Sequence, residues 1–155
     1  MEDFFEATYE DLDDDKLERL NRFRNLSIEK LKLIKPLWVN EETQEKAQLI
    51  NFNDYTIIVV STELLIQKAH LLGLKTETIF NNQINDFRYI TTLEMWENKE
   101  YVDPPTIFIK NFETQTISIS DGRHRTILAN YLGQKTIPIV VPKYDVDKIS
   151  EILKE

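Results

Sequence analysis

The residues with the clearest chemical potential in this 155-residue chain lie between Ile117 and Thr126. An alternating run ends at Ser120, and Asp-Gly and then Arg-His-Arg-Thr follow it. This pattern predicts a strand, a glycine turn and the start of a helix, whose free N–H groups bind anions. Glycine allows close approach of a phosphate, and arginine suits two-point contact with phosphate oxygens. The segment therefore predicts an anion site, and a nucleotide phosphate is the ligand we expect.

Each polar side chain of this segment has an expected role. The residues expected to bind the ligand are Gly122, Arg123, His124, Arg125 and Thr126. His124 can donate to a phosphate oxygen or transfer a proton, and Asp121 is the second candidate catalytic residue because it could orient a hydroxyl or a metal. Two alternatives stay open. Asp121 could cap the helix instead, and the two arginines could be solvated surface charges, since neighbouring helical residues point in different directions.

The elements around this segment are of mixed type. Apolar spacing, capping residues and proline positions predict helices over 15–35 (with a second start at Ser27), 41–49, 63–72, 92–98, 123–132 and 145–153. Strands are predicted over 55–60, 106–110, 115–120 and 136–141. We expect the first strand to be buried and the last, which contains Pro138, to lie at an edge or to begin there. His70 is expected to have a structural role inside its helix.

This order of elements predicts an α+β fold, a small mixed sheet with flanking helices. Residues 46–155 are expected to form the domain, and residues 1–45 an acidic N-terminal helical extension. The extension either packs on the domain as a helical hairpin or serves as an arm for a protein partner. Phe4, Phe5 and Tyr9, set among acidic residues, motivate the second interpretation.

Composition excludes several classes of protein. The chain has no cysteine, which rules out disulfides, thiolate zinc sites and cysteine nucleophiles. The formal net charge of −8 disfavours non-specific DNA binding, which depends on Lys and Arg. A local basic cluster of Arg123, Arg125, Lys135 and Lys143 is compatible with that charge. The sequence lacks a long apolar run and a signal-peptide pattern, so we expect no membrane span and a cytoplasmic location.

The segment Ser118–Gly133, followed by Thr136–Val141, resembles the ParB/sulfiredoxin superfamily. In that superfamily a turn of glycine and arginine binds the phosphates of ATP or CTP, and Gly122 and Arg125 match those two positions. The resemblance implies a ParB/sulfiredoxin-like fold that binds a nucleoside triphosphate with Mg²⁺. The missing cysteine excludes a sulfiredoxin-type reductase. Kinases of the superfamily need a carboxylate base, for which the candidates are Glu63, Asp86, Glu94 and Glu97.

Three functions follow as hypotheses. The first is a nucleotide-binding protein that acts as a switch, an NTPase or a small-molecule kinase, with phosphoryl transfer promoted by positioning and charge neutralisation. The second is a non-catalytic interaction or inhibitor module of phage or plasmid type, which would use the acidic N-terminal region. The third is a ParB-like nuclease, for which converging carboxylates would be required.

Overall fold

The computed structural model describes residues 7–71, 74–81 and 86–154. Its centre is a five-stranded mixed sheet with the strand order β1-β5-β3-β4-β2. The neighbours β1 and β5 are antiparallel, as are β3 and β4, whereas β3 with β5 and β2 with β4 are parallel. The strands are β1 (Tyr55–Ser61), β2 (Ala69–His70), β3 (Thr106–Asn111), β4 (Thr116–Asp121) and β5 (Thr136–Pro142).

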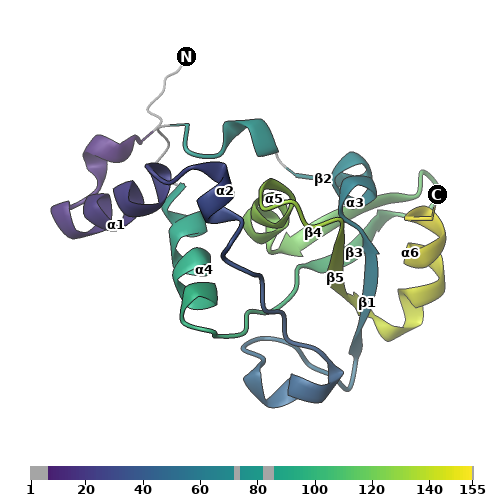
Figure 1. The fold of residues 1–155 in the computed structure, drawn as a ribbon. Helices are drawn as coiled ribbons and strands as arrows, with labels where there is room; N and C mark the ends of the chain where they lie inside the picture. The colour runs from purple at the N-terminus through teal and green to yellow at the C-terminus, as the bar shows by residue number, and fades with distance from the viewer. Residues whose placement is uncertain (1–6, 72–73, 82–85, 155) are drawn as a thin grey trace.

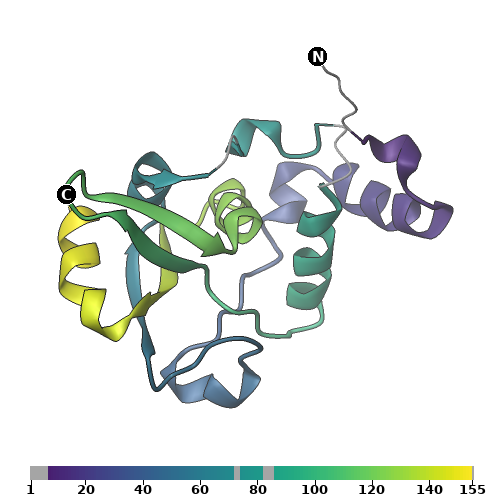
Figure 2. The same cartoon turned by 180° about the vertical axis from the view of Figure 1, so that it is seen from behind.

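Helices cover both faces of this sheet. The α-helices are α1 (Asp14–Arg24), α2 (Ile28–Leu31), α3 (Thr62–Lys68), α4 (Phe87–Glu97), α5 (Arg123–Tyr131) and α6 (Val146–Ile152). Short 3-10 helices span Tyr9–Asp11, Glu41–Lys46, Thr76–Thr78 and Lys143–Asp145. Figures 1 and 2 show α6 on one side of the sheet and α5 on the other, with α4 and then α1 farther out beyond α5. The expected α+β class with flanking helices is confirmed.

The core forms where the period-2 pattern of the hairpin meets the helices. Ile107 and Ile109 of β3 and Ile117 and Ile119 of β4 are buried, because alternate residues of a strand face the same side. Ile127 and Leu128 of α5 are buried with them. The predicted β3–β4 hairpin is therefore confirmed, and its apolar face fixes the direction in which α5 leaves β4.

The N-terminal extension belongs to the same core. Leu20 and Phe23 of α1 are fully buried, and Leu31 of α2 is nearly so. Ser27 caps α2 as predicted, since its hydroxyl accepts a hydrogen bond from the Lys30 N–H at 3.3 Å. Of the two arrangements expected for this region, the structure has the one packed on the domain. Phe4 and Phe5 lie outside the described residues.

The predicted helix over 63–72 is shorter than expected. Ser61 caps it, with the hydroxyl 3.2 Å from the Leu64 nitrogen, but α3 ends at Lys68. Ala69 and His70 instead pair in parallel with Ile117 and Ser118 of β4. The interpretation of His70 as a helical residue is therefore wrong, because pairing with a distant strand overrides the local helical periodicity. Gly73, which directly follows the predicted helix over 63–72 and could cap its C-terminus, lies outside the described residues.

The segment 41–49 is also less regular than predicted. Only Glu41–Lys46 is helical, as a kinked 3-10 helix with Thr43 at φ −118°. Two sets of side-chain hydrogen bonds hold this segment in a conformation other than a longer helix. The Glu41 carboxylate accepts from the Thr56 hydroxyl on β1 at 3.0 Å, and the Asp103 carboxylate accepts from the N–H groups of Gln48 and Leu49.

Two strand positions differ from the expectation. β1 is an edge strand and is only partly buried, with Val59 66% exposed, so its apolar run is not a fully buried strand. β5 lies inside the sheet between β1 and β3 although it contains Pro138. The proline is tolerated because β3 pairs with β5 at Thr106 and Val140, beyond the proline.

Helix α4 starts earlier than the predicted helix over 92–98. It begins at Phe87, so it carries an additional turn that includes Arg88 and Thr91. Within the part of the chain that the structure describes, no helix has the length and apolar composition needed to cross a membrane.

Candidate anion-binding site

The turn between β4 and α5 has an unusual conformation at its centre. Gly122 is the N-cap residue of α5 and lies in the left-handed region, at φ +99° and ψ 20°. A Cβ atom on this residue would lie 2.8 Å from the Pro105 Cα and 3.0 Å from the Arg125 Nη2. Both the backbone angle and the close contact require glycine here. The predicted glycine turn between the strand and the helix is confirmed, whereas the role of Gly122 in binding a phosphate stays a prediction.

The first turn of α5 has no side-chain cap and no acidic residue. Its first backbone hydrogen bond joins the Thr126 N–H to the Gly122 carbonyl at 2.9 Å. The three N–H groups before it, on residues 123–125, belong to the set that a helix cannot pair internally. Asp121 does not cap the helix, so that alternative is wrong: it ends β4, and Gly122 occupies the N-cap position.

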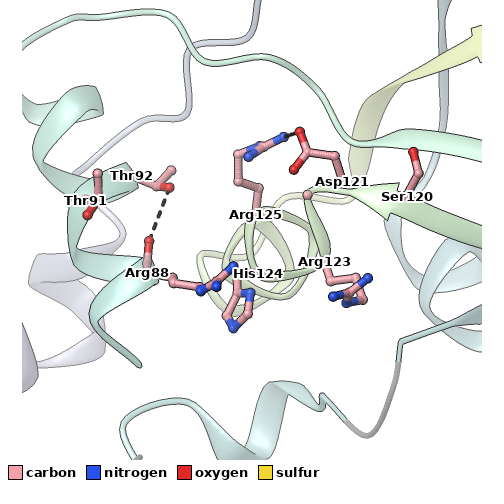
Figure 3. Close-up of a pocket in the computed structure, with 9 residues that line it drawn as sticks. Arg88, Thr91, Thr92, Ser120, Asp121, Arg123, His124 and Arg125 are labelled. Carbon is pink, nitrogen blue, oxygen red and sulfur yellow. Dashed lines mark hydrogen bonds and ion pairs between the residues drawn. The ribbon is translucent and has the colours of Figure 1, made fainter. Parts of the chain in front are cut away.

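A polar cavity of about 350 Å³ lies over this helix start. Its wall combines the β4–α5 turn with one side of α4, as Figure 3 shows. The lining residues are Arg88, Thr91, Thr92, Ser120, Asp121, Gly122, Arg123, His124 and Arg125. Five of the six residues predicted for the site, from Asp121 to Arg125, are among them. The turn therefore forms one wall of a pocket, and Arg123 and Arg125 are both partly buried there.

Arg125 is held directly above the glycine turn. Its Nη2 donates to the Asp121 Oδ2 at 3.0 Å, and its side chain is 21% exposed. The Arg125 Nε is buried and has no hydrogen-bond partner within the described residues. A buried donor without a partner is costly unless something accepts from it. Arg125 thus keeps one donor unpaired beneath the cavity surface.

Arg123 and Arg88 supply two further positive charges. Arg123 donates from Nη1 to the Ile119 carbonyl at 3.3 Å, which orients it along the end of β4. Arg88 comes from α4 and is exposed, and Figure 3 shows its side chain extending toward His124. Three arginines and one carboxylate therefore line the cavity, which leaves an excess of positive charge. An anion would satisfy that excess.

His124 is neutral at physiological pH in this environment. Burial, followed by the positive charges of Arg88, Arg123 and Arg125, lowers the pKa of its imidazole to about 4. The ring packs on Tyr89 with 5.2 Å between ring centroids. Burial, followed by the charge of Asp86, raises the pKa of that tyrosine. A neutral His124 can donate one N–H to a phosphate oxygen, but it carries no proton to release as an acid at neutral pH.

Thr126 is the one predicted site residue that does not line the cavity. Its side chain is fully buried, and its hydroxyl donates to the Gly122 carbonyl at 2.9 Å. This hydroxyl fixes the first turn of α5. Lys135 and Lys143 of the expected basic cluster also lie away from the cavity wall.

The four candidate carboxylate bases do not line the cavity either. Glu94 and Glu97 bind Arg19 and Arg22 of α1. Asp86 is buried and accepts a hydrogen bond from the Tyr9 hydroxyl at 2.6 Å. Glu63 is exposed in the first turn of α3. Asp121 is therefore the only carboxylate at the cavity wall among the residues that the structure describes.

Sequence reasoning missed the α4 wall of the cavity, which consists of Arg88, Thr91 and Thr92. It also missed Ser120, although that residue immediately precedes the predicted turn. The α4 residues lie about thirty positions before the turn, and their polar spacing carries no local mark of a binding site. The only signal in the sequence would have been the basic side chain of Arg88, once the helix was predicted to include it.

A second cavity of about 240 Å³ adjoins the first across Arg125 and Asp121. The two share Thr91, Thr92, Asp121 and Arg125 as a common wall. The second is less polar in character because Leu49, Met95 and Val102 line it. Together they form a depression with a cationic end and a mixed apolar end.

The comparisons with protein-family models, with curated proteins and with solved structures found no match to this chain. The ParB/sulfiredoxin resemblance of the turn therefore stays a prediction. Among the described residues, no group of three or more His, Asp or Glu side chains converges on a point that could hold a metal ion.

Proposed function

We propose that this protein binds a nucleoside triphosphate, with the phosphates against the start of α5. The observation that carries the proposal is the cationic cavity over Gly122, where Arg88, Arg123 and Arg125 surround an uncapped helix start. Backbone N–H groups and arginine donors in this arrangement favour a ligand with several anionic oxygens. The resemblance of the turn to nucleotide-binding proteins points the same way.

The adjoining cavity favours a nucleotide over bare phosphate. A triphosphate on the arginines would direct the rest of the ligand past Arg125 toward Leu49, Met95 and Val102. Apolar lining with a few polar groups is typical of sites for organic ligands. The nucleoside would occupy this less polar end.

Magnesium would accompany such a ligand. Mg²⁺ is commonly bound by one or two carboxylates together with phosphate oxygens. Asp121, half exposed at the cavity wall, is the residue that would contact it, and it fits a metal bound chiefly through the ligand. The ion would supply further neutralisation of phosphate charge.

Binding is the part of this function that the residues support best. The arginines and the helix start would orient the phosphates and neutralise their charge, which is the principal protein contribution to phosphoryl transfer. The neutral His124 would accept or donate a hydrogen bond without supplying an acid. We therefore propose a nucleotide-binding protein and leave hydrolysis or transfer to the assay below.

The test is a titration of the protein with ATP, CTP, GTP and inorganic tripolyphosphate, each with and without Mg²⁺, followed by thermal unfolding and calorimetry. A ligand at about 100 times its dissociation constant should add roughly 2.7 kcal/mol to the free energy of unfolding. Nucleotide binding that exceeds tripolyphosphate binding supports the proposal. Absence of binding by all four ligands would overturn it, and release of phosphate from a bound nucleotide would identify an enzyme.

A further inference from the structure

Helix α4 has three faces with different tasks. At about 3.6 residues per turn, residues three, four and seven positions apart share a side. The core face carries Tyr89, Leu93 and Trp96, which are buried. The face toward the candidate site carries Arg88, Thr91, Thr92 and Met95. The third face carries Phe87, Glu94 and Glu97, which contact α1.

Two paired arginines join α1 to the C-terminal half of α4. Arg19 binds Glu94 through both Nε and Nη2, with the Nε contact at 2.9 Å. Arg22 binds Glu97 in the same two-point manner, with one contact at 3.1 Å. Two-point pairing fixes the orientation of both partners more firmly than a single contact does. The partners lie 75 positions apart in the sequence, so these pairs are tertiary contacts.

Three contacts hold the N-terminal end of α4. The Arg19 guanidinium lies 4.9 Å from the centroid of the Phe87 ring, and the Lys16 ammonium lies 5.7 Å from it. The Tyr9 hydroxyl donates to the Asp86 carboxylate at 2.6 Å. Asp86 is the N-cap residue of α4. The segment from Tyr9 to Arg22 therefore contacts α4 at both ends. Figures 1 and 2 show α1 and α4 as neighbours.

Repulsion between positive charges at the site would push α4 away from α5. Arg88 lines the same cavity as Arg123 and Arg125 of α5, and like charges repel each other. No carboxylate of α4 faces the cavity to offset this repulsion, because Glu94 and Glu97 are turned toward α1. An outside support that holds α4 in place would keep the three arginines together before a ligand arrives.

We propose that Arg19 and Arg22 of α1 are positioning residues for the anion site, which hold α4 so that Arg88 lines the same cavity as Arg123 and Arg125. This inference rests on the proposed function, because it concerns the same site. It gives the N-terminal segment a task within the domain. A preorganised cavity binds more tightly since its ligand does not have to bring the cationic side chains together.

The experiment measures tripolyphosphate affinity by calorimetry at low ionic strength in a double-mutant cycle. The variants are Arg19→Glu, Arg88→Ala and the two combined. We expect Arg19→Glu to weaken binding about five- to tenfold, because it sets two carboxylates against each other and releases α4. In the Arg88→Ala background the same change should have no further effect, since the side chain to be positioned is absent. A charge exchange, Arg19→Glu with Glu94→Arg, should restore affinity.

Lys30→Glu is the matched control. It makes the same change of charge at an exposed position of α2, and it should change affinity less than twofold. Thermal unfolding of each variant checks that it remains folded. An equal loss of affinity from Arg19→Glu with and without Arg88 would overturn the inference, as would an unchanged affinity. If tripolyphosphate does not bind the parent protein, the proposed function fails instead, so the two failures are distinguishable.

Discussion

Two α-helices of this domain, α3 and α5, start directly at the end of a strand. A side chain caps the first turn of α3 but not that of α5. At the β1–α3 turn, the Ser61 hydroxyl accepts from the Leu64 N–H, and Glu63 lies in the first turn. At the β4–α5 turn, Gly122 takes the capping position without a side chain, and the first turn holds Arg123 and Arg125. The same strand-to-helix connection thus occurs once with a side chain that caps the helix N–H groups and once without such a cap.

The difference follows from the electrostatics of a helix start. Acidic residues and capping oxygens stabilise it, because the unpaired N–H groups carry partial positive charge. Arginines at the same place add positive charge, which disfavours the helix start until an anion offsets it. The β1–α3 turn contributes stability to the fold, whereas the β4–α5 turn lacks that contribution and leaves its first N–H groups without a side-chain cap.

The largest effect expected from breaking this contrast is that of Gly122→Ala. The new Cβ would meet the Pro105 backbone at 2.8 Å in a left-handed conformation, so we expect a loss of about 3 kcal/mol in the free energy of unfolding. Gly133→Ala is the control. Gly133 also has a positive φ, of +83°, but its Cβ would meet only the flexible Lys32 side chain at 3.4 Å, so about 1 kcal/mol is expected. Chemical denaturation measures both, and equal losses would contradict the proposed clash.

Arg125→Ala should separate binding from stability. Loss of a charge-assisted contact to phosphate is expected to weaken tripolyphosphate binding by about 2 kcal/mol, roughly thirtyfold. The ion pair with the half-exposed Asp121 is worth little, so the free energy of unfolding should change by less than about 0.5 kcal/mol. Lys135→Ala removes a charge away from the cavity and should leave affinity nearly unchanged. An equal effect of the two substitutions on binding would show that only net charge matters.

Ser61→Ala makes the opposite test on the other turn. Removal of its capping hydroxyl should lower the free energy of unfolding by about 1 kcal/mol. Tripolyphosphate affinity should not change, because Ser61 lies outside both cavities of the candidate site. Calorimetry and denaturation on the same preparation check both parts. A drop in affinity would mean that the two turns are coupled.

The two walls of the candidate site differ in how far the sequence could predict them. The strand, turn and helix from Thr116 to Tyr131 follow local rules, namely period-2 alternation, a glycine at a positive φ and helical apolar spacing. The second wall of the site follows no local rule. Arg88 reaches it because Leu93 and Trp96 bury the opposite side of α4 and because α1 holds that helix. The helical prediction for His70 fails for the same reason, since its strand exists only through pairing with β4.

The smallest effect concerns pH and tests whether the arginines of α5 really face a shared cavity. Because the pKa of His124 is lowered to about 4 in the folded protein, the unfolded chain binds the proton more readily. The stabilising effect of a neutral ring is complete above the ordinary pKa of about 6.5 and is lost as pH falls toward 4. NMR titration of the imidazole should show this lowered pKa, and His124→Gln should flatten the stability profile between these pH values.

Bound sulfate sharpens that titration, because its charge is constant over this range. An anion beside the arginines offsets their repulsion of the imidazolium, so we expect the pKa of His124 to rise when sulfate binds. By linkage, sulfate should then bind more tightly as pH falls toward the folded-state pKa of about 4. The signal of His70, exposed on β2 away from the cavity, serves as the reference and should not respond. A His124 signal that also ignores sulfate would place the anion elsewhere and break the contrast between the two turns.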